Sequence, residues 1–144
     1  RVEQAKSFGA TAGVVSGDAD WKEQVFALTD GLGVDVAIEA VGIPATFQMC
    51  IDIVRPGGTI ANVGVHGGPV ELPLHELWIS NIAITTGLVN TNTAAMLLKM
   101  VTEDKIQPEK FVSHTFTLDN IIEAYDVFTR AAETKALKVL ISAT

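Results

Sequence analysis

The sequence predicts an α/β fold built on a parallel, doubly wound sheet, and three observations predict it. A strand, a helix and a second strand follow one another between Val34 and Val65, which is a βαβ unit with a right-handed crossover. Both of these strands run into a glycine, as strands before tight βα turns do. Apolar residues make up 48% of the 144 positions and charged residues 19%, which is enough for one hydrophobic core and excludes a disordered chain.

The first residues predict the last turns of a helix that is closed by Gly9. This helix pattern begins at Arg1 without a cap, so we expect an upstream segment to be absent and the chain to be a fragment. A short strand is predicted at 13–15. A helix capped by Asp18 or Asp20 should follow, because Trp21, Val25 and Leu28 fall at i, i+4 and i+7.

The βαβ unit and the elements after it are marked by turn residues. A strand at 34–41 precedes a helix that begins near Pro44 and places Phe47, Cys50, Ile51 and Val54 on one face. Residues 55–58 predict a turn. Strands are predicted at 59–65, 82–88 and 138–141, a helix at 93–104 and extended chain at 111–116. A further helix, capped near Thr117, is predicted to face inward with Leu118, Ile121, Ile122, Tyr125 and Phe128.

Charge and length exclude several classes of partner. The net charge is −7 with scattered acids, whereas a protein that binds the phosphate backbone needs a basic face, so no nucleic acid is expected. No stretch approaches the roughly 18 apolar residues of a membrane span. The single cysteine, Cys50, excludes an intrachain disulfide and suits a cytoplasmic enzyme.

The glycines at the two strand ends, Gly42 and Gly64, are the first candidate binding residues. Ligands of open parallel sheets bind outside the carboxyl ends of the strands, where glycine lets a flat ligand approach the backbone. An equally good interpretation is that both glycines only permit tight turns.

Several motifs are absent, and their absence limits the chemistry. The chain has no Gly-x-Gly-x-x-Gly and no Walker-type phosphate loop. His66, His75 and His114 share no ligand spacing with one another or with Cys50, so no metal site is expected within the chain. His66, just past a strand end, is the histidine with a candidate role, whereas Cys50 fits the core. The acids Asp35 and Glu39 lie on a buried-looking strand and are expected to be partnered near its ends.

Four segments in order resemble zinc-dependent medium-chain alcohol dehydrogenases. They are residues 5–11, 33–42, 54–65 and 136–140, and the resemblance covers nearly the whole chain with matching spacings. It implies a Rossmann-like sheet that is incomplete, because the first two strands and the glycine-rich loop would lie upstream. The chain would hold a partial dinucleotide-binding domain at 1–90 and a terminal segment at 91–144 that completes the cofactor and catalytic domains.

The resemblance implies hydride transfer between an alcohol or aldehyde and NAD, with NADP possible, and a zinc ion whose ligands lie outside this chain. It implies no catalytic residue here. Ala40 and Val41 would lie beneath the adenine-side ribose and pyrophosphate, and Val63 and Val65 would contact the nicotinamide. The full set of cofactor-binding candidates is Arg1, Ala40, Val41, Gly42, Val63, Gly64, Val65, Leu88, Asn90 and Lys138.

Three of these candidates could also be explained without a cofactor. Val63 and Val65 are also good strand residues, and Lys138 could be a solvated lysine. Three other classes stay open: a zinc-free quinone or enoyl reductase, a methyltransferase that binds a nucleoside cofactor, and an inactive binding fragment. The strand at 82–88 resembles one that pairs with its mate across a dimer, which implies a homo-oligomer.

The isolated chain should neither bind the cofactor tightly nor catalyse the reaction. In the sheet order 3-2-1-4-5-6 that the resemblance implies, the strand at 13–15 loses its neighbour and the strand at 34–41 exposes a hydrophobic edge. A fluorescence titration of the 144-residue chain with NADH checks this expectation. Micromolar affinity would overturn it.

Overall fold

The structure is a computed structural model that describes residues 1–143, and it divides into two compact units. The first unit comprises residues 2–89. The second comprises Arg1 together with the chain from Asn90 onward. Each unit has its own sheet, and none of the helices described is both long and apolar enough to cross a bilayer.

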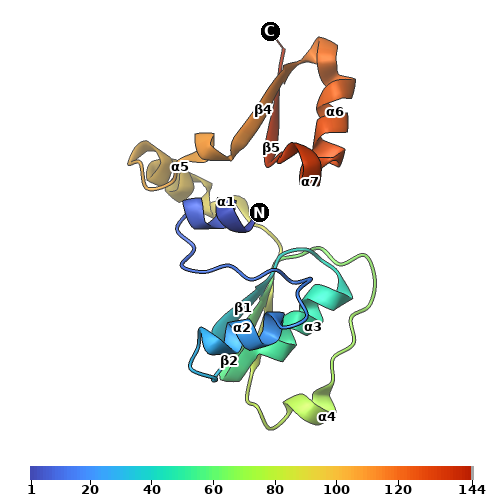
Figure 1. Cartoon of the computed structure of the whole chain (residues 1–144). Coiled ribbons are helices and arrows are strands. Elements are labelled where there is room, and N and C mark those ends of the chain that lie inside the picture. The colour runs from blue at the N-terminus through green and yellow to red at the C-terminus, as the bar shows by residue number, and fades with distance from the viewer. Residues whose placement is uncertain (144) are drawn as a thin grey trace. The chain divides into compact units, whose positions relative to one another are not determined.

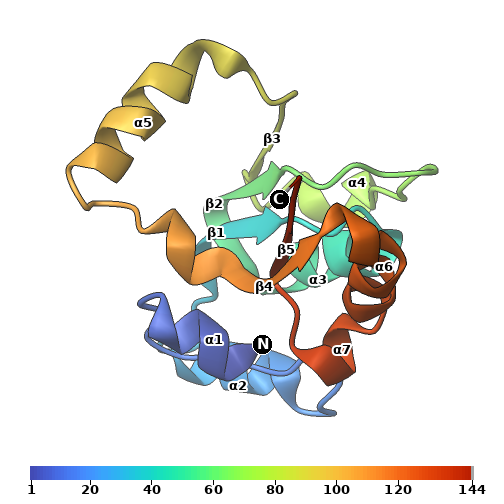
Figure 2. The same ribbon diagram turned by 90° about the horizontal axis from the view of Figure 1, so that it is seen from above.

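The first unit holds a parallel sheet of three strands, β1 (Val34–Glu39), β2 (Val54–Asn62) and β3 (Ala83–Thr86), in the order β1-β2-β3. Helix α3 (Pro44–Ile53) connects the first two strands, so the predicted βαβ unit is confirmed. Figure 2 shows β1 and β2 running in the same direction. The strand order is the one expected for the second half of a doubly wound sheet.

The core of this unit lies between α3 and the sheet. Pro44 occupies the first turn of α3, where its missing N–H leaves no hydrogen bond unmade. Phe47 and Cys50 point from the helix onto Ala37 and Ile60 of the sheet, and all four are buried. The predicted inward face of the helix is therefore confirmed at Phe47 and Cys50. Ile51 and Val54 also pack against this core, but the assignment of Val54 to the helix is wrong, because Val54 begins β2.

The turn predicted at 55–58 is also wrong, because these residues lie within β2 and do not separate it from α3. Val34 pairs with Val54 and Val36 pairs with Thr59, so β2 carries extra residues between the two pairs and bulges. Gly57 has a φ of +74°, which the bulge needs and which glycine tolerates. Arg55 Nε donates to Asp35 Oδ1 at 2.5 Å across the bulge, so Asp35 is partnered at the surface.

The segment before β1 has helices and no strand. Helix α1 (Val2–Ser7) ends before Gly9 as predicted. Residues 13–15 are not a strand, because no neighbouring strand is present among the described residues to complete a ladder with them. Asp20 precedes helix α2 (Trp21–Ala27), but its side chain makes no cap and instead accepts from Gln24.

The remaining helix of the first unit is α4 (Leu74–Leu77), which precedes β3. Figure 1 shows α2 and α3 beside the sheet formed by β1 and β2. Strands β1 and β3 are the two edges of this sheet within the described chain. Leu28, expected to face inward from α2, is exposed because it follows the end of that helix.

The second unit has a two-stranded parallel sheet of β4 (Val112–Thr117) and β5 (Lys138–Ser142). The predicted extended segment and the closing strand are confirmed. The helical elements of this unit are η1 (Thr91–Thr93), α5 (Ala94–Thr102), η2 (Pro108–Phe111), η3 (Leu118–Asn120), α6 (Ile121–Thr129) and α7 (Ala131–Thr134).

The inward face predicted for the helix after Thr117 is not buried in this unit. Ala124 is the buried residue of α6, whereas five predicted core residues are exposed: Leu118, Ile121, Ile122, Tyr125 and Phe128. Two strands offer too little surface to cover an amphipathic helix, so its apolar stripe stays open. Thr117 and Asn120 precede η3 and α6 without a side-chain cap.

Replacing Ile60 by alanine should destabilise the first unit by about 2–5 kcal/mol, because it leaves a cavity in a close-packed core. Ile60 is 0% exposed in the central strand. Urea unfolding followed by circular dichroism measures the change. The matched variant Ile79→Ala alters a side chain that is 68% exposed and should change stability by less than about 0.5 kcal/mol. Equal losses in the two variants would contradict this description of the core.

Candidate functional site

The candidate site lies at the carboxyl edge of the three-stranded sheet. Glu39 pairs with Asn62 in the β1–β2 register, and Asn62 pairs with Thr86 in the β2–β3 register. The segments that follow these three residues therefore leave the sheet side by side. They hold all seven of the predicted cofactor-binding residues that lie in the first unit: Ala40, Val41, Gly42, Val63, Gly64, Val65 and Leu88.

Glu39 connects these segments through both its side chain and its backbone. Its Oε1 accepts hydrogen bonds from the backbone N–H groups of Val41 and Gly42, each at 2.8 Å, and from Thr46 Oγ1 at 2.6 Å. Its backbone carbonyl accepts from the N–H groups of Val63 at 2.8 Å and Gly64 at 3.1 Å. One buried residue thus holds the turn after β1, the first turn of α3 and the end of β2. The expectation that Glu39 is partnered is confirmed.

Gly42 and Gly64 lie against each other beneath this edge. A Cβ at Gly64 would collide with Glu39 Oε2 and with the backbone nitrogen of Gly42. A Cβ at Gly42 would collide with the backbone carbonyl of Val65, and Gly42 also has a φ of +89°. Backbone packing alone therefore requires both glycines, which is the tight-turn interpretation of these two residues.

Hydrogen bonds decide the charge state of Glu39. Burial raises the pKa of its carboxyl group, but the hydrogen bonds from Thr46, Gly42 and Val41, together with the charge of His66, lower that pKa below its ordinary value of 4.5. The carboxylate form is therefore the one that the fold stabilises. The same negative charge raises the pKa of the buried Cys50 thiol, after the larger effect of burial, so Cys50 is a core residue.

His66 lies on the other side of this carboxylate. Its Nε2 is 2.8 Å from Asn62 Oδ1 and 3.3 Å from Glu39 Oε2. Asn62 Nδ2 donates to the carbonyl of Gly64 at 3.0 Å. The edge of Phe47 packs against the imidazole with ring centroids 6.2 Å apart. Glu39 Oε2 and His66 Nδ1 are buried and have no hydrogen bond.

Exposed apolar side chains stand on this edge. Val41 is 64% exposed, Val63 59%, Val65 90% and Leu88 95%. Four aliphatic side chains at the ends of three adjacent parallel strands form a surface on which a flat, partly apolar ring can lie. We call this set the strand-end surface. The structure places Ala40, Val41, Val63, Val65 and Leu88 just after the ends of β1, β2 and β3, and their binding role stays a prediction.

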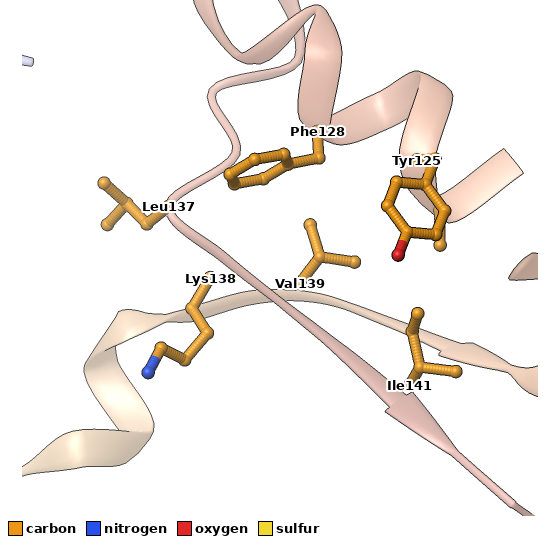
Figure 3. Close-up of a pocket in the computed structure, with 7 residues that line it drawn as sticks. Tyr125, Phe128, Leu137, Lys138, Val139 and Ile141 are labelled. Atoms are coloured by element: carbon orange, nitrogen blue, oxygen red, sulfur yellow. The ribbon is translucent and has the colours of Figure 1, made fainter. Parts of the chain in front are cut away.

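The other three predicted residues belong to the second unit. Arg1 Nη2 donates to the carbonyl of Ala136 at 2.8 Å, and Asn90 Oδ1 accepts from the N–H of Asn92 at 3.1 Å. Lys138 begins β5 beside an apolar groove under α6. Figure 3 shows Val139 and Ile141 lying toward Tyr125 and Phe128, whereas the Lys138 amine points away from them.

Sequence reasoning missed Thr46 and Asn62 as members of the site. Thr46 lies in the first turn of a helix, where threonine is common for reasons of helix capping alone. Asn62 is a polar residue in a buried strand, which was the available signal for a side-chain hydrogen bond. Within residues 1–143, no group of three or more His, Cys, Asp or Glu side chains could hold a metal ion.

Comparison with known proteins points to one family. The family model described as zinc-binding dehydrogenase matches residues 1–103. An alcohol dehydrogenase of Cupriavidus necator is 32% identical over 132 residues, covering 89% of this chain and 36% of that protein. An NADP-dependent isopropanol dehydrogenase of Thermoanaerobacter brockii is 38% identical over 131 residues, covering 86% of this chain and 37% of that protein.

Solved structures agree. The apo form of zinc-dependent alcohol dehydrogenase 2 from Streptococcus pneumonia has a TM-score of 0.91 and 53% identity, covering 99% of this chain and 42% of that one. An alcohol dehydrogenase from Thermus sp. ATN1 has a TM-score of 0.88 and 31% identity, covering 99% and 41%. The chain thus spans about two fifths of the length of these structures. The Rossmann-like fold predicted from sequence is confirmed.

Replacing Glu39 by glutamine should remove part of the loss of stability on acidification. The folded state lowers the pKa of Glu39, so its ionisation stabilises the fold fully above the ordinary value of 4.5, and this contribution is lost as the pH falls through the lower folded-state pKa. The free energy of unfolding by urea, measured from pH 7 down to the lowest pH at which the protein is folded, should fall less steeply with pH in Glu39→Gln than in the unaltered protein. The variant Asp35→Asn, at an exposed ion pair, is the control and should keep the slope. An unchanged slope in Glu39→Gln would contradict this assignment.

Proposed function

The chain belongs to the zinc-binding dehydrogenase family, and from this premise we propose that it forms the nicotinamide side of the cofactor site in an NAD(P)-dependent alcohol dehydrogenase. The reaction is hydride transfer between an alcohol carbon and the nicotinamide ring, interconverting alcohol and aldehyde or ketone. The observation that carries the proposal is the exposed strand-end surface of Val41, Val63, Val65 and Leu88 on a rigid backbone edge.

The work of these residues is to bind and orient. Val63 and Val65 pack against one face of the nicotinamide ring and exclude water from it. The backbone carbonyl of Val63 and the backbone of Leu88 and Asn90 offer the donor and acceptor that a carboxamide needs, which determines the ring face presented to the substrate. Ala40 and Val41 lie beneath the ribose and pyrophosphate, and Gly42 and Gly64 let the backbone segments that carry them pack closely together.

The resemblance also suggests cofactor contacts for two cations, and these we propose from the resemblance alone. Arg1 lies near the adenosine ribose, and Lys138 meets the pyrophosphate as a point charge rather than a bidentate fork. The Lys138 amine points away from the apolar groove, which keeps it available for an anion (Figure 3). The relatives include an enzyme named as NADP-dependent, so either nicotinamide dinucleotide fits the family.

The catalytic zinc of such an enzyme is not held by the residues described here, since they provide no suitable donor cluster. We assign it to another part of the complete enzyme, where it supplies Lewis-acid polarisation of the alcohol oxygen. The substrate is accordingly a small alcohol or aldehyde whose identity is set outside this chain. The single cysteine fits a cytoplasmic enzyme.

A second copy of the chain is the proposed protein partner. Strand β3 pairs with β2 on one side, and all four of its residues are exposed. Its other edge has no strand beside it in the described chain, so an identical strand could pair there and extend the sheet. We therefore place the homo-oligomer contact along the segment 82–88.

Replacing Val65 by aspartate should weaken NADH binding by at least about tenfold, because it puts a negative charge on a surface that receives an apolar ring. Val65 is 90% exposed, so the fold should be unaffected. Fluorescence titration with NADH of the protein purified from its source gene gives the dissociation constants.

The matched control for this titration is Leu32→Asp. Leu32 is an exposed aliphatic residue before the amino end of β1, which is the opposite end of the strand. This variant carries the same charge and should bind NADH as the unaltered protein does. Unchanged binding in Val65→Asp, or an equal loss in both variants, would argue against a cofactor on the strand-end surface.

A further inference from the structure

The two oxygens of the Glu39 carboxylate are satisfied unequally. Oε1 accepts three hydrogen bonds, from Val41, Gly42 and Thr46. Oε2 is buried without any, and the nearest donor is His66 Nε2 at 3.3 Å. A buried carboxylate oxygen without a hydrogen bond raises the energy of the fold, so a shorter contact between Oε2 and the His66 imidazole would be favourable.

The hydrogen bonds of Asn62 determine where the imidazole proton lies. Its Nδ2 donates to the Gly64 carbonyl, which leaves Oδ1 as the atom that faces His66 Nε2 at 2.8 Å. Oδ1 can only accept, so Nε2 carries the hydrogen. That N–H is directed to Asn62 Oδ1, and Glu39 Oε2 lies 3.3 Å from the same nitrogen without a hydrogen bond.

These contacts close a ring between two strands. Glu39 ends β1, Asn62 ends β2, and Gly64 lies between Val63 and Val65 of the strand-end surface. His66 joins the side chains of Glu39 and Asn62, while the Glu39 carbonyl holds the N–H groups of Val63 and Gly64. The imidazole is linked to the backbone between the two valines through Asn62, whose Oδ1 faces His66 and whose Nδ2 donates to the Gly64 carbonyl.

We propose that His66, acting through Asn62 beside the buried Glu39 carboxylate, is a positioning residue that sets the height of Val63 and Val65 beneath the nicotinamide ring, an inference that rests on the proposed function. The 3.3 Å contact shortens when the ring is bound, as hydrogen bonds at sites often do on ligand binding. His66 touches neither cofactor nor substrate. Its effect falls on the nicotinamide half, because Asn62 holds the Gly64 carbonyl, whereas Glu39 Oε1 holds the turn at Val41 and Gly42.

The experiment compares two ligands of the protein purified from its source gene. NADH carries the nicotinamide ring, and ADP-ribose lacks that ring but keeps the adenosine, both phosphates and the second ribose. His66→Leu removes the donor while filling the space. His66→Gln is the matched control, because its amide nitrogen reaches the place of Nε2. Isothermal titration gives both dissociation constants for each variant.

His66→Leu should bind NADH about tenfold more weakly, roughly the effect of losing the hydrogen bond to Asn62 Oδ1, and should bind ADP-ribose unchanged. His66→Gln should recover most of the NADH affinity. A purely structural role would weaken both ligands together and would not be rescued. Equal losses for both ligands, unchanged NADH binding, or no recovery with glutamine would each overturn the proposal.

Two further results keep the proposals apart. If His66→Leu does not fold by circular dichroism, His66→Asn replaces it, because its shorter amide fills a polar site without reaching Glu39, and the same NADH-selective loss is expected. If the unaltered protein binds ADP-ribose but not NADH, the proposed function of the strand-end surface fails, and the role of His66 fails with it. If the unaltered protein binds NADH normally but the His66 variants lose NADH and ADP-ribose affinity equally, only the positioning role of His66 is overturned.

Discussion

The buried carboxylate of Glu39 is the constraint on which the carboxyl edge of the sheet depends. Placing a charged group inside a core is costly unless donors surround it, and here three donors on one oxygen provide that compensation. Those donors come from the turn after β1 and from α3, and the Glu39 backbone accepts from the residues that follow β2. Glu39 therefore fixes the position of the end of β1 relative to the end of β2. Gly64 follows from it, since a side chain there would strike Glu39 Oε2, and Gly42 follows from the close approach of the Val65 backbone.

Much of the first unit could be predicted from sequence because its signals are local. Pro44 at a helix start, β-branched runs and the spacing of Phe47 and Cys50 each act within one element, so the βαβ unit and its core were correctly placed. The bulge at 55–58 was mistaken for a turn because glycine and proline mark both. The strand predicted at 13–15 failed because a strand also needs a neighbour, which sequence patterns do not provide.

The candidate site was predictable in outline only. Residues after strand ends were identified by position, and the resemblance supplied their cofactor roles, but the network beneath them depends on side-chain directions and on the pairing of β1 with β2, which brings Glu39 to His66. Thr46 and Asn62 are ordinary residues until the fold brings them to Glu39 and His66. The amphipathic face of α6 shows the opposite limit: periodicity identified its apolar stripe correctly, yet burial depends on what lies against it, and this unit leaves Tyr125 and Phe128 exposed.

Nuclear magnetic resonance of the isotopically labelled protein, purified from its source gene, tests the central claim most directly. The account predicts that saturating NADH shifts the backbone amides of Val63, Gly64 and Val65, that ADP-ribose leaves them in place, and that both ligands shift Val41. Gly33, before the opposite end of β1, should respond to neither. Unmoved Val63–Val65 amides at saturating NADH would contradict a nicotinamide site on this edge of the sheet.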